Sequence, residues 1–109
     1  MEYMSNSKVI LSLTKAGDDL SKPRQVDHWL YFKNEADRNL FITYTAKENY
    51  KLEGKKYVEK APLHFQLHIS RIDKVDMNSI TEITKRLRKK AKELNGDYDG
   101  WETFVIKDK

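Results

Sequence analysis

The sequence lacks cysteine altogether and has no long uninterrupted run of hydrophobic residues. Without cysteine the chain can form no disulfide, offer no thiolate to a metal ion and carry out no cysteine-based catalysis. The most apolar stretch near the N-terminus, residues 9–13, is too short for a signal sequence or a membrane span, and Lys15 follows almost at once. We therefore expect a cytoplasmic protein that has no membrane partner.

Internal repeats and low-complexity tracts are also missing from these 109 residues. A chain of this length buries roughly two thirds of its unfolded surface, which suits one hydrophobic core. Its 39% hydrophobic residues exclude a disordered chain, and its 35% charged residues predict a heavily solvated surface. We expect one domain over residues 1–109, whose net charge of +4 weakly favours acidic partners.

Hydrophobic periodicity predicts three helices. The first covers residues 5–16, and Gly17 can end it in a left-handed conformation. Asn34 can cap the second, over residues 35–48, and Asp76 or Ser79 can cap the third, which runs to Gly96. The side chains expected to face the core are Val9, Ile10 and Leu13 in the first helix, Ala36, Leu40, Phe41 and Tyr44 in the second, and Met77, Ile80, Ile83, Leu87, Ala91 and Leu94 in the third.

Alternating patterns predict four strands, over residues 25–32, 50–59, 63–70 and 100–107. Gly54 marks the second as a bulged or edge strand, because a glycine inside a strand weakens regular pairing. The order of elements predicts an α+β fold, a ferredoxin-like sandwich with a four-stranded antiparallel sheet and two helices on one face, plus a short N-terminal helix. The first and third strands would then be central.

These two central strands are predicted to alternate between a helix-covered face and an opposite face. The inward residues are Val26, His28, Leu30 and Phe32 on the first strand and Leu63, Phe65, Leu67 and Ile69 on the third. The opposite face collects five candidate partner-binding residues, Trp29, Tyr31, His64, Gln66 and His68. We expect the N-terminal helix or a second copy of the chain to cover this face; peptide or protein binding and base stacking on RNA are the alternatives.

The spacing of the histidines does not favour metal binding or catalysis. His64 and His68 are four residues apart along one strand, about 13 Å, and so cannot share a tetrahedral ion. His28 falls on the apolar side of its strand, where a hydrogen-bonded core histidine is more common than a catalytic one. We therefore predict no metal, no cofactor and no catalytic residue.

Charged residues form two acidic pairs and one basic helix face. Asp18 with Asp19, and Asp97 with Asp99, lie beside glycines, where turn formation is a better explanation than a pair of catalytic carboxylates. A basic face on an exposed helix is usually only solvated, although the one on the third helix could bind phosphates or an acidic protein. Its residues, on the third helix, are Lys85, Arg86, Arg88, Lys89, Lys90 and Lys92.

Near its end the chain is expected to turn through Gly100 into a strand led by Trp101. Tyr98 and Trp101 flank the Asp99-Gly100 pair, and both rings could either be buried at the junction or be presented to a partner. Tyr98, Asp99 and Trp101 are therefore further candidate partner-binding residues. We favour burial, because Gly100 permits a close backbone approach and Asp99 can accept the hydrogen bonds of a turn.

The segment Asn95-Gly96-Asp97-Tyr98-Asp99-Gly100-Trp101 resembles the C-terminal signature of the regulator of ribonuclease activity B family. The similarity covers about residues 8–106 and includes the helix that leads into Gly17-Asp18-Asp19 and the aromatic strand that contains His28. It implies a ferredoxin-like fold without enzymatic activity. It also implies a protein that binds a noncatalytic part of ribonuclease E and changes its RNA processing and degradosome composition.

One feature departs from the family, since its well-known members are strongly acidic and suit a basic partner, whereas this chain is basic. Two functions therefore stay open. The first is a protein-binding regulator of RNA decay, whose partner would be a ribonuclease. The second is a direct RNA-binding module that uses the aromatic sheet face and the basic helix. An enzyme is a distant third, and a homo-oligomer is open in each case.

Overall fold

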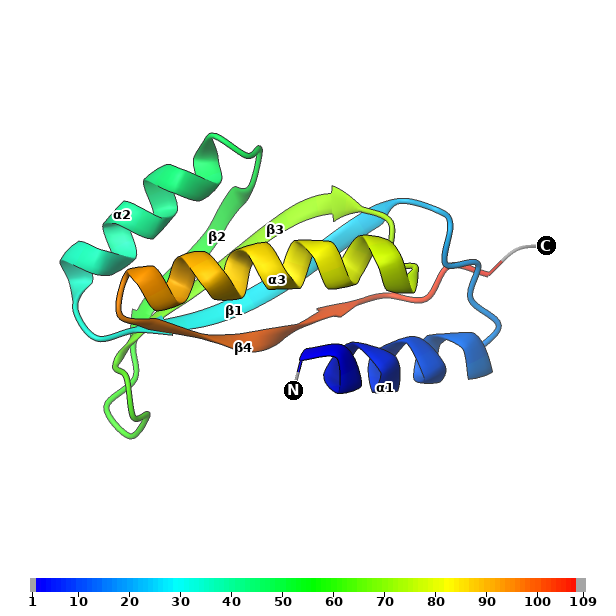
Figure 1. The fold of residues 1–109 in the computed structure, drawn as a ribbon, viewed down its shortest axis with the longest axis horizontal. Coiled ribbons are helices and arrows are strands. Elements are labelled where there is room, and N and C mark those ends of the chain that lie inside the picture. Colours follow the sequence, from blue (N-terminus) through cyan, green and yellow to red (C-terminus); the bar gives the residue numbers. More distant parts are fainter. Residues whose placement is uncertain (1, 108–109) are drawn as a thin grey trace.

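The computed structural model describes residues 2–107, with side chains described from residue 6 onward. Within this part of the chain, no helix is long and apolar enough to cross a membrane. The elements, in chain order, are α1 (Glu2–Lys15), β1 (Arg24–Phe32), α2 (Glu35–Ala46), β2 (Lys51–Tyr57), β3 (Phe65–Asp73), α3 (Met77–Glu93) and β4 (Gly96–Thr103) (Figure 1).

The strands form one antiparallel sheet in the order β2-β3-β1-β4. β1 pairs with β3 along its whole length, from Arg24 opposite Asp73 to Phe32 opposite Phe65. β1 and β3 are therefore the central strands, as the sequence predicts. The α+β class and the four-stranded antiparallel sheet are confirmed, and the order of elements is the predicted one.

All three helices pack on the same face of this sheet, which we call the covered face. Phe41 of α2 and Leu87 of α3 join Leu30 of β1 and Leu67 of β3 in one core cluster. In Figure 1, α3 runs along the sheet while α2 is inclined beside β2. The alternation predicted for β1 is confirmed, because Val26, Leu30 and the other inward residues of this strand are fully buried.

α1 extends the covered face beyond α3. Its buried residue Leu13 belongs to a second core cluster with Val26, Val75, Ile80 and Trp101. The apolar stripe predicted for this helix is thus confirmed, because Val9 and Ile10 also pack against that cluster. Gly17 has φ +84° and ends the helix as predicted.

Side-chain caps begin the other two helices. The Asn34 side chain accepts a hydrogen bond of 2.8 Å from the Asp37 backbone N–H at the start of α2. At α3, Asp76 accepts from the backbone N–H of Ser79 at 3.1 Å and from its hydroxyl at 2.8 Å. Asp76, not Ser79, is therefore the cap, since an N-cap side chain bonds to the amide three residues later.

The predicted last strand, residues 100–107, is wrong, because β4 begins at Gly96 and ends at Thr103. Asn95, with φ +57°, lets the chain reverse directly after α3. A Cβ on Gly96 would lie 2.5 Å from the Phe32 ring, so only glycine lets β4 pass so close to the end of β1. The strand therefore starts where the turn was expected.

The Asp99-Gly100 pair is a β-bulge inside β4 rather than a turn. Trp29 lies opposite Gly100 and Leu30 lies opposite Tyr98, which leaves Asp99 as the extra residue. Gly100 has φ +143°, a conformation that other residues rarely adopt. Because of the extra residue, Tyr98 and Trp101 face the same side of the sheet although they are three positions apart.

Two smaller predictions fare differently at the β2–β3 hairpin. β2 is an edge strand with a bulge at Glu53, next to Gly54, as the sequence predicts. β3, in contrast, begins at Phe65 and not at residue 63, so Leu63 lies in the connecting loop and only Leu67 and Ile69 are fully buried. The alternation extends beyond the paired residues, and a pattern alone does not mark where pairing stops.

The apolar stripe predicted for α2 is partly wrong. Ala36 is exposed and Leu40 is 57% exposed, whereas the buried residues of this helix are Arg38, Phe41 and Thr45. Arg38 can be buried because its guanidinium donates to the Gln66 carbonyl at 3.2 Å and lies 5.2 Å from the centre of the Phe65 ring. Arg38 therefore forms part of the buried side of α2, and Leu40 lies toward solvent.

Candidate functional site on the open face of the sheet

The sheet face opposite the helices carries no helix within the described chain, and we call it the open face. The prediction that the N-terminal helix covers it is wrong, because the stripe of α1 packs on the covered face against Val26 and Trp101. Residues paired across neighbouring strands point to the same side of a sheet. The centre of the open face therefore comprises Asp27, Trp29 and Tyr31 of β1 with Gln66, His68 and Ser70 of β3.

A stacked pair of rings occupies the middle of this face. Trp29 and His68 lie opposite each other in the β1–β3 register, with ring centroids 4.4 Å apart and planes inclined by 15°. The Nε2 atom of His68 lies 2.8 Å from a carboxylate oxygen of Asp27. That contact fixes the orientation of the imidazole, so the half-buried Trp29 presents a preorganised aromatic surface.

A hollow of about 270 Å³ lies next to the stacked pair, at the end of β1. The Tyr31 hydroxyl accepts a hydrogen bond of 2.7 Å from the Gln66 side chain, which holds the tyrosine ring in place. The β2–β3 loop supplies the opposite wall and β4 supplies two carboxylates. The lining residues are Tyr31, Ala61, Pro62, Leu63, Asp97 and Asp99.

The two aromatic candidates of β4 lie on the covered face. Tyr98 is 6% exposed and Trp101 is 9% exposed. The indole N–H of Trp101 donates to the Asn6 side-chain oxygen at 2.8 Å, which ties β4 to α1. The bulge directs both rings inward and leaves Asp99 exposed, so the structure brings only Asp99 of these three candidates to the open face.

His28 is fully buried on the covered face, as its strand position predicts. Its Nδ1 atom lies 2.8 Å from the Tyr98 hydroxyl, and Nε2 has no partner among the described residues. Burial lowers the pKa of His28 to about 3, and the nearby positive charge of Arg71 adds to the shift. The imidazole is therefore neutral near pH 7 and forms part of the core.

His64 lies apart from the other candidates. It precedes β3, its Nδ1 atom is 3.1 Å from the Val58 carbonyl, and its ring lies 5.2 Å from that of Tyr57. It therefore steadies the β2–β3 loop at the edge of the sheet. Within the described residues, no three His, Asp or Glu side chains are grouped so that they could hold a metal ion.

The basic residues of α3 lie on the far side of the molecule from the open face. Ile83, Leu87 and Ala91 turn one side of the helix toward the sheet. The opposite side carries Lys85, Arg86, Lys89 and Lys92, which are exposed, whereas Arg88 is half-buried over the Tyr98 ring at 5.4 Å. Apart from Arg88 over the buried Tyr98 ring, the basic candidates lie on a different surface from Trp29 and Tyr31.

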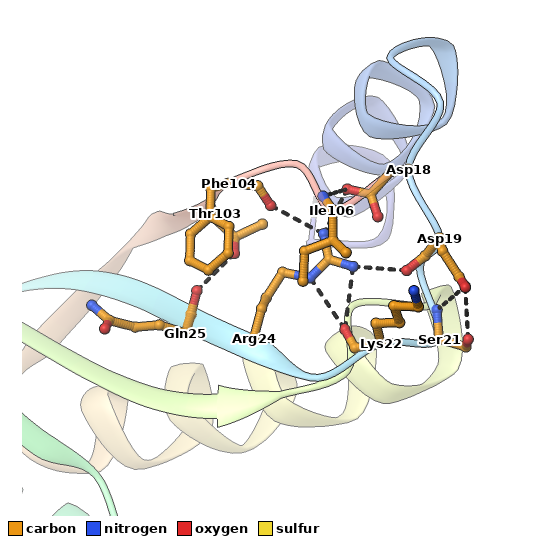
Figure 2. Close-up of polar contacts among 9 residues, drawn as sticks. All are labelled: Asp18, Asp19, Ser21, Lys22, Arg24, Gln25, Thr103, Phe104 and Ile106. Carbon is orange, nitrogen blue, oxygen red and sulfur yellow. Dashed lines mark hydrogen bonds and ion pairs between the residues drawn. The ribbon is translucent and has the colours of Figure 1, made fainter. Parts of the chain in front are cut away.

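The first acidic pair has a structural role (Figure 2). The guanidinium of Arg24 lies 2.5 Å from an Asp18 carboxylate oxygen, and both side chains are fully buried. Arg24 also donates to the carbonyls of Asp19, Lys22 and Phe104, at 2.8, 3.2 and 3.0 Å. This network joins the loop after α1 to the segment that follows β4, and no catalytic carboxylate pair results.

A second hollow, of about 290 Å³, lies between α2 and α3. Its cations already have partners: Arg71 donates to Asp73 at 2.8 Å and to the Glu48 carbonyl at 2.9 Å, and Arg86 contacts Glu82 at 3.2 Å. Its wall therefore carries both signs of charge. The charged residues that line the hollow beside Tyr31 are, in contrast, both carboxylates.

Sequence reasoning missed several residues that shape this region. Arg24 and Asn6 carry no sequence signal for burial, since both are polar and lie near element ends. Residues 61–63 could be recognised as a loop from Pro62, but nothing in the sequence shows that this loop folds against Tyr31. The extra residue of β4 was equally hidden, although Gly100 marks its position.

Comparison with known proteins identifies one family. A family model described as "Regulator of ribonuclease activity B" matches residues 4–103 of the chain. The match begins within α1 and ends at the last residue of β4. A search of curated proteins finds no match.

Proposed function

Because the chain belongs to the regulator of ribonuclease activity B family, we propose that it is a non-enzymatic regulator that binds a ribonuclease through the open face. The family consists of regulators of ribonuclease activity. Ribonuclease E is the specific target that the family resemblance suggests. We further propose that the chain acts in the cytoplasm as one domain.

The observation that carries this proposal is the stacked pair at the centre of a sheet face that no helix covers. Trp29 and His68 are held by the Asp27 contact, and Tyr31 is held by Gln66. Aromatic side chains that are already ordered lose little conformational entropy on binding, and Trp and Tyr are enriched among the residues that dominate binding energy. The open face therefore has the properties of a protein-binding surface.

The arrangement of charges disfavours direct binding of RNA. A strand of RNA would need stacking surfaces and phosphate-binding cations on one side of the protein. The stacked pair lies on the open face, whereas Lys85, Lys89 and Lys92 project from α3 on the other side. An RNA strand that stacks on Trp29 would not reach those lysines. On the open face itself it would meet Lys51 and Lys56 of β2 at one edge, but the exposed carboxylates of β4 at the other.

The surroundings of the titratable groups also support a non-enzymatic role. His28 is neutral and buried among core residues, and Asp18 forms a buried ion pair with Arg24. Catalysis by either group would require contact with a substrate, which burial prevents. Burial therefore excludes His28 and Asp18 as reacting groups.

The test is a binding and activity assay with purified ribonuclease E from the organism that encodes the chain. Replacement of Trp29 by alanine should weaken binding by about thirtyfold, because truncating a central aromatic residue costs about 2 kcal/mol or more. The variant should also fail to change the rate at which the ribonuclease cleaves a fluorescent RNA. Circular dichroism should show an unchanged fold.

Phe104→Ala is the matched control, since Phe104 is an exposed aromatic residue that follows the last paired residue of β4 and its backbone carbonyl, which accepts from Arg24, is retained. This control should bind like the parent. Nuclease treatment of the mixture should leave binding intact. The proposal fails if Trp29→Ala binds and regulates the ribonuclease like the parent, or if the complex disappears with nuclease treatment.

A further inference from the structure

The open face is not uniform in charge. The β1–β4 register places Asp97 beside Tyr31 and Glu102 beside Asp27, and the bulge residue Asp99 lies between them. All three carboxylates on β4 are exposed, and we call them the acidic strip. At the other edge of the sheet, Lys51 and Lys56 of β2 lie opposite Ser70 and Gln66.

Two hollows lie along the acidic strip and share Asp99. The first is the hollow of about 270 Å³ that combines the Tyr31 ring and apolar loop residues with Asp97 and Asp99. The second is more open, about 400 Å³, and is lined by Trp29, Asp99, Gly100, Trp101 and Glu102. Among the described residues, neither hollow is lined by a lysine or an arginine.

Each hollow combines an apolar or aromatic wall with carboxylates. That combination suits the side chains of arginine and lysine, whose methylene stems pack on apolar surface while the cationic end pairs with carboxylates. An arginine guanidinium can also stack on an indole or phenol ring. Phosphate groups, in contrast, would be repelled by the strip.

The spacing of the hollows defines the shape of the ligand. Tyr31 and Trp29 are alternate residues of β1, and alternate residues of a strand are about 7 Å apart. In an extended peptide, side chains that point to the same side recur at the same interval. Two cationic side chains at positions i and i+2 of an extended peptide would therefore reach both hollows.

We propose that the open face binds an extended segment with arginine or lysine at alternate positions, which lies along β4 and places one cation in each hollow. This rests on the proposed function, because it specifies the chemistry of the segment through which the ribonuclease is bound. Lys33 follows β1, two residues beyond Tyr31, and its backbone N–H donates to the Asn95 carbonyl. It lies past the end of the strip.

The test uses short fluorescein-labelled peptides and fluorescence anisotropy. One peptide carries arginines at i and i+2 in a glycine–serine background, a second carries them at i and i+1, and a third has glutamates at i and i+2. The first should bind best, the second should bind several-fold more weakly because its cations point to opposite sides, and the third should not bind. Higher salt should weaken binding of the first peptide, as expected for exposed charges.

Matched variants locate the site. Asp97→Asn with Asp99→Asn should weaken binding of the first peptide at least tenfold, because two charge-assisted contacts are lost. Glu82→Gln with Glu93→Gln changes the net charge equally on exposed positions of α3 and should leave the affinity within twofold. Both double variants should melt within a few degrees of the parent, since all four positions are exposed.

Three outcomes would overturn the proposal: equal affinity for the i, i+2 and i, i+1 peptides, equal losses in the two double variants, or tighter binding of a single-stranded RNA that depends on Trp29. If ribonuclease binding needs Trp29 but the first peptide ignores the acidic strip, this proposal fails and the proposed function stands. If the peptide binds the strip while ribonuclease does not bind the chain, the proposed function fails and the peptide site stands.

Discussion

The buried ion pair between Arg24 and Asp18 predicts a large and specific loss of stability when it is broken. The two side chains are fully buried, and Arg24 also satisfies the carbonyls of Asp19, Lys22 and Phe104. Asp18 accepts a further hydrogen bond of 3.3 Å from the Ile106 backbone N–H. The pair thus connects segments that are far apart in the sequence (Figure 2).

Arg24→Met retains much of the side-chain volume but leaves the Asp18 carboxylate buried without its cation. Removal of one partner of a buried pair costs about 3–5 kcal/mol. Asp18→Asn should cost less, about 1.5–3 kcal/mol, because Arg24 keeps its three carbonyl acceptors and loses only the charged one. The double variant should be more stable than the sum of the single losses predicts, since neither charge is left unpaired.

Urea denaturation followed by circular dichroism measures these free energies of unfolding. Arg86→Met is the control, because its ion pair with Glu82 is exposed and should contribute about 1 kcal/mol or less. A loss below about 1 kcal/mol for Arg24→Met, together with additive losses in the double variant, would refute the reasoning. The ion pair would then not hold the loop after α1 against the segment that follows β4.

Two further predictions concern the core. His28 has its pKa lowered by burial to about 3 from an unfolded value near 6.5, so the unfolded state binds more protons as the pH falls through this window. The contribution of neutral His28 to the free energy of unfolding should therefore be complete above pH 6.5 and fall by about 2 kcal/mol between pH 7 and pH 5. The His28→Asn variant should lack this loss in paired urea titrations. Equal losses in both proteins would contradict the assignment. Trp101→Ala should destabilise the fold by about 3–5 kcal/mol and speed amide exchange in α1. Trp101→Phe should lose mainly the hydrogen bond to Asn6. If Trp101→Ala melts like the parent but no longer binds the ribonuclease, Trp101 belongs to the interface and not to the core.

The parts of the fold that the sequence predicts correctly are those in which burial follows a simple period. Leu67 and Ile69 alternate along β3, and Ile80, Ile83 and Leu87 recur along α3, so each element shows its buried side without reference to its neighbours. Asn34 and Asp76 likewise bond only to amides three residues ahead. Local periodicity and local hydrogen bonds are therefore sufficient for these elements.

The errors arise where two distant segments decide the result. The stripe of α1 shows that one side of the helix is buried, but the choice of sheet face depends on Asn6 meeting Trp101, 95 positions away. The bulge at Asp99 similarly depends on the register with β1. The candidate site depends on both: α1 was expected to cover the face that it leaves open, and the bulge separates Asp99 from Tyr98 and Trp101, whose favoured burial is confirmed.

The distribution of charge bears on the partner more than the net charge does. The total of +4 sums over surfaces that no single partner contacts at once. A helix is about 10 Å across, so the lysines on the outer side of α3 are separated from the open face by more than the Debye length of about 8 Å at physiological salt. A segment bound on the open face would therefore experience the carboxylates of β4 much more strongly than the lysines of α3, and a basic chain can keep an acidic binding surface. The net positive charge of this chain is consequently no evidence against a partner that presents cations to the open face.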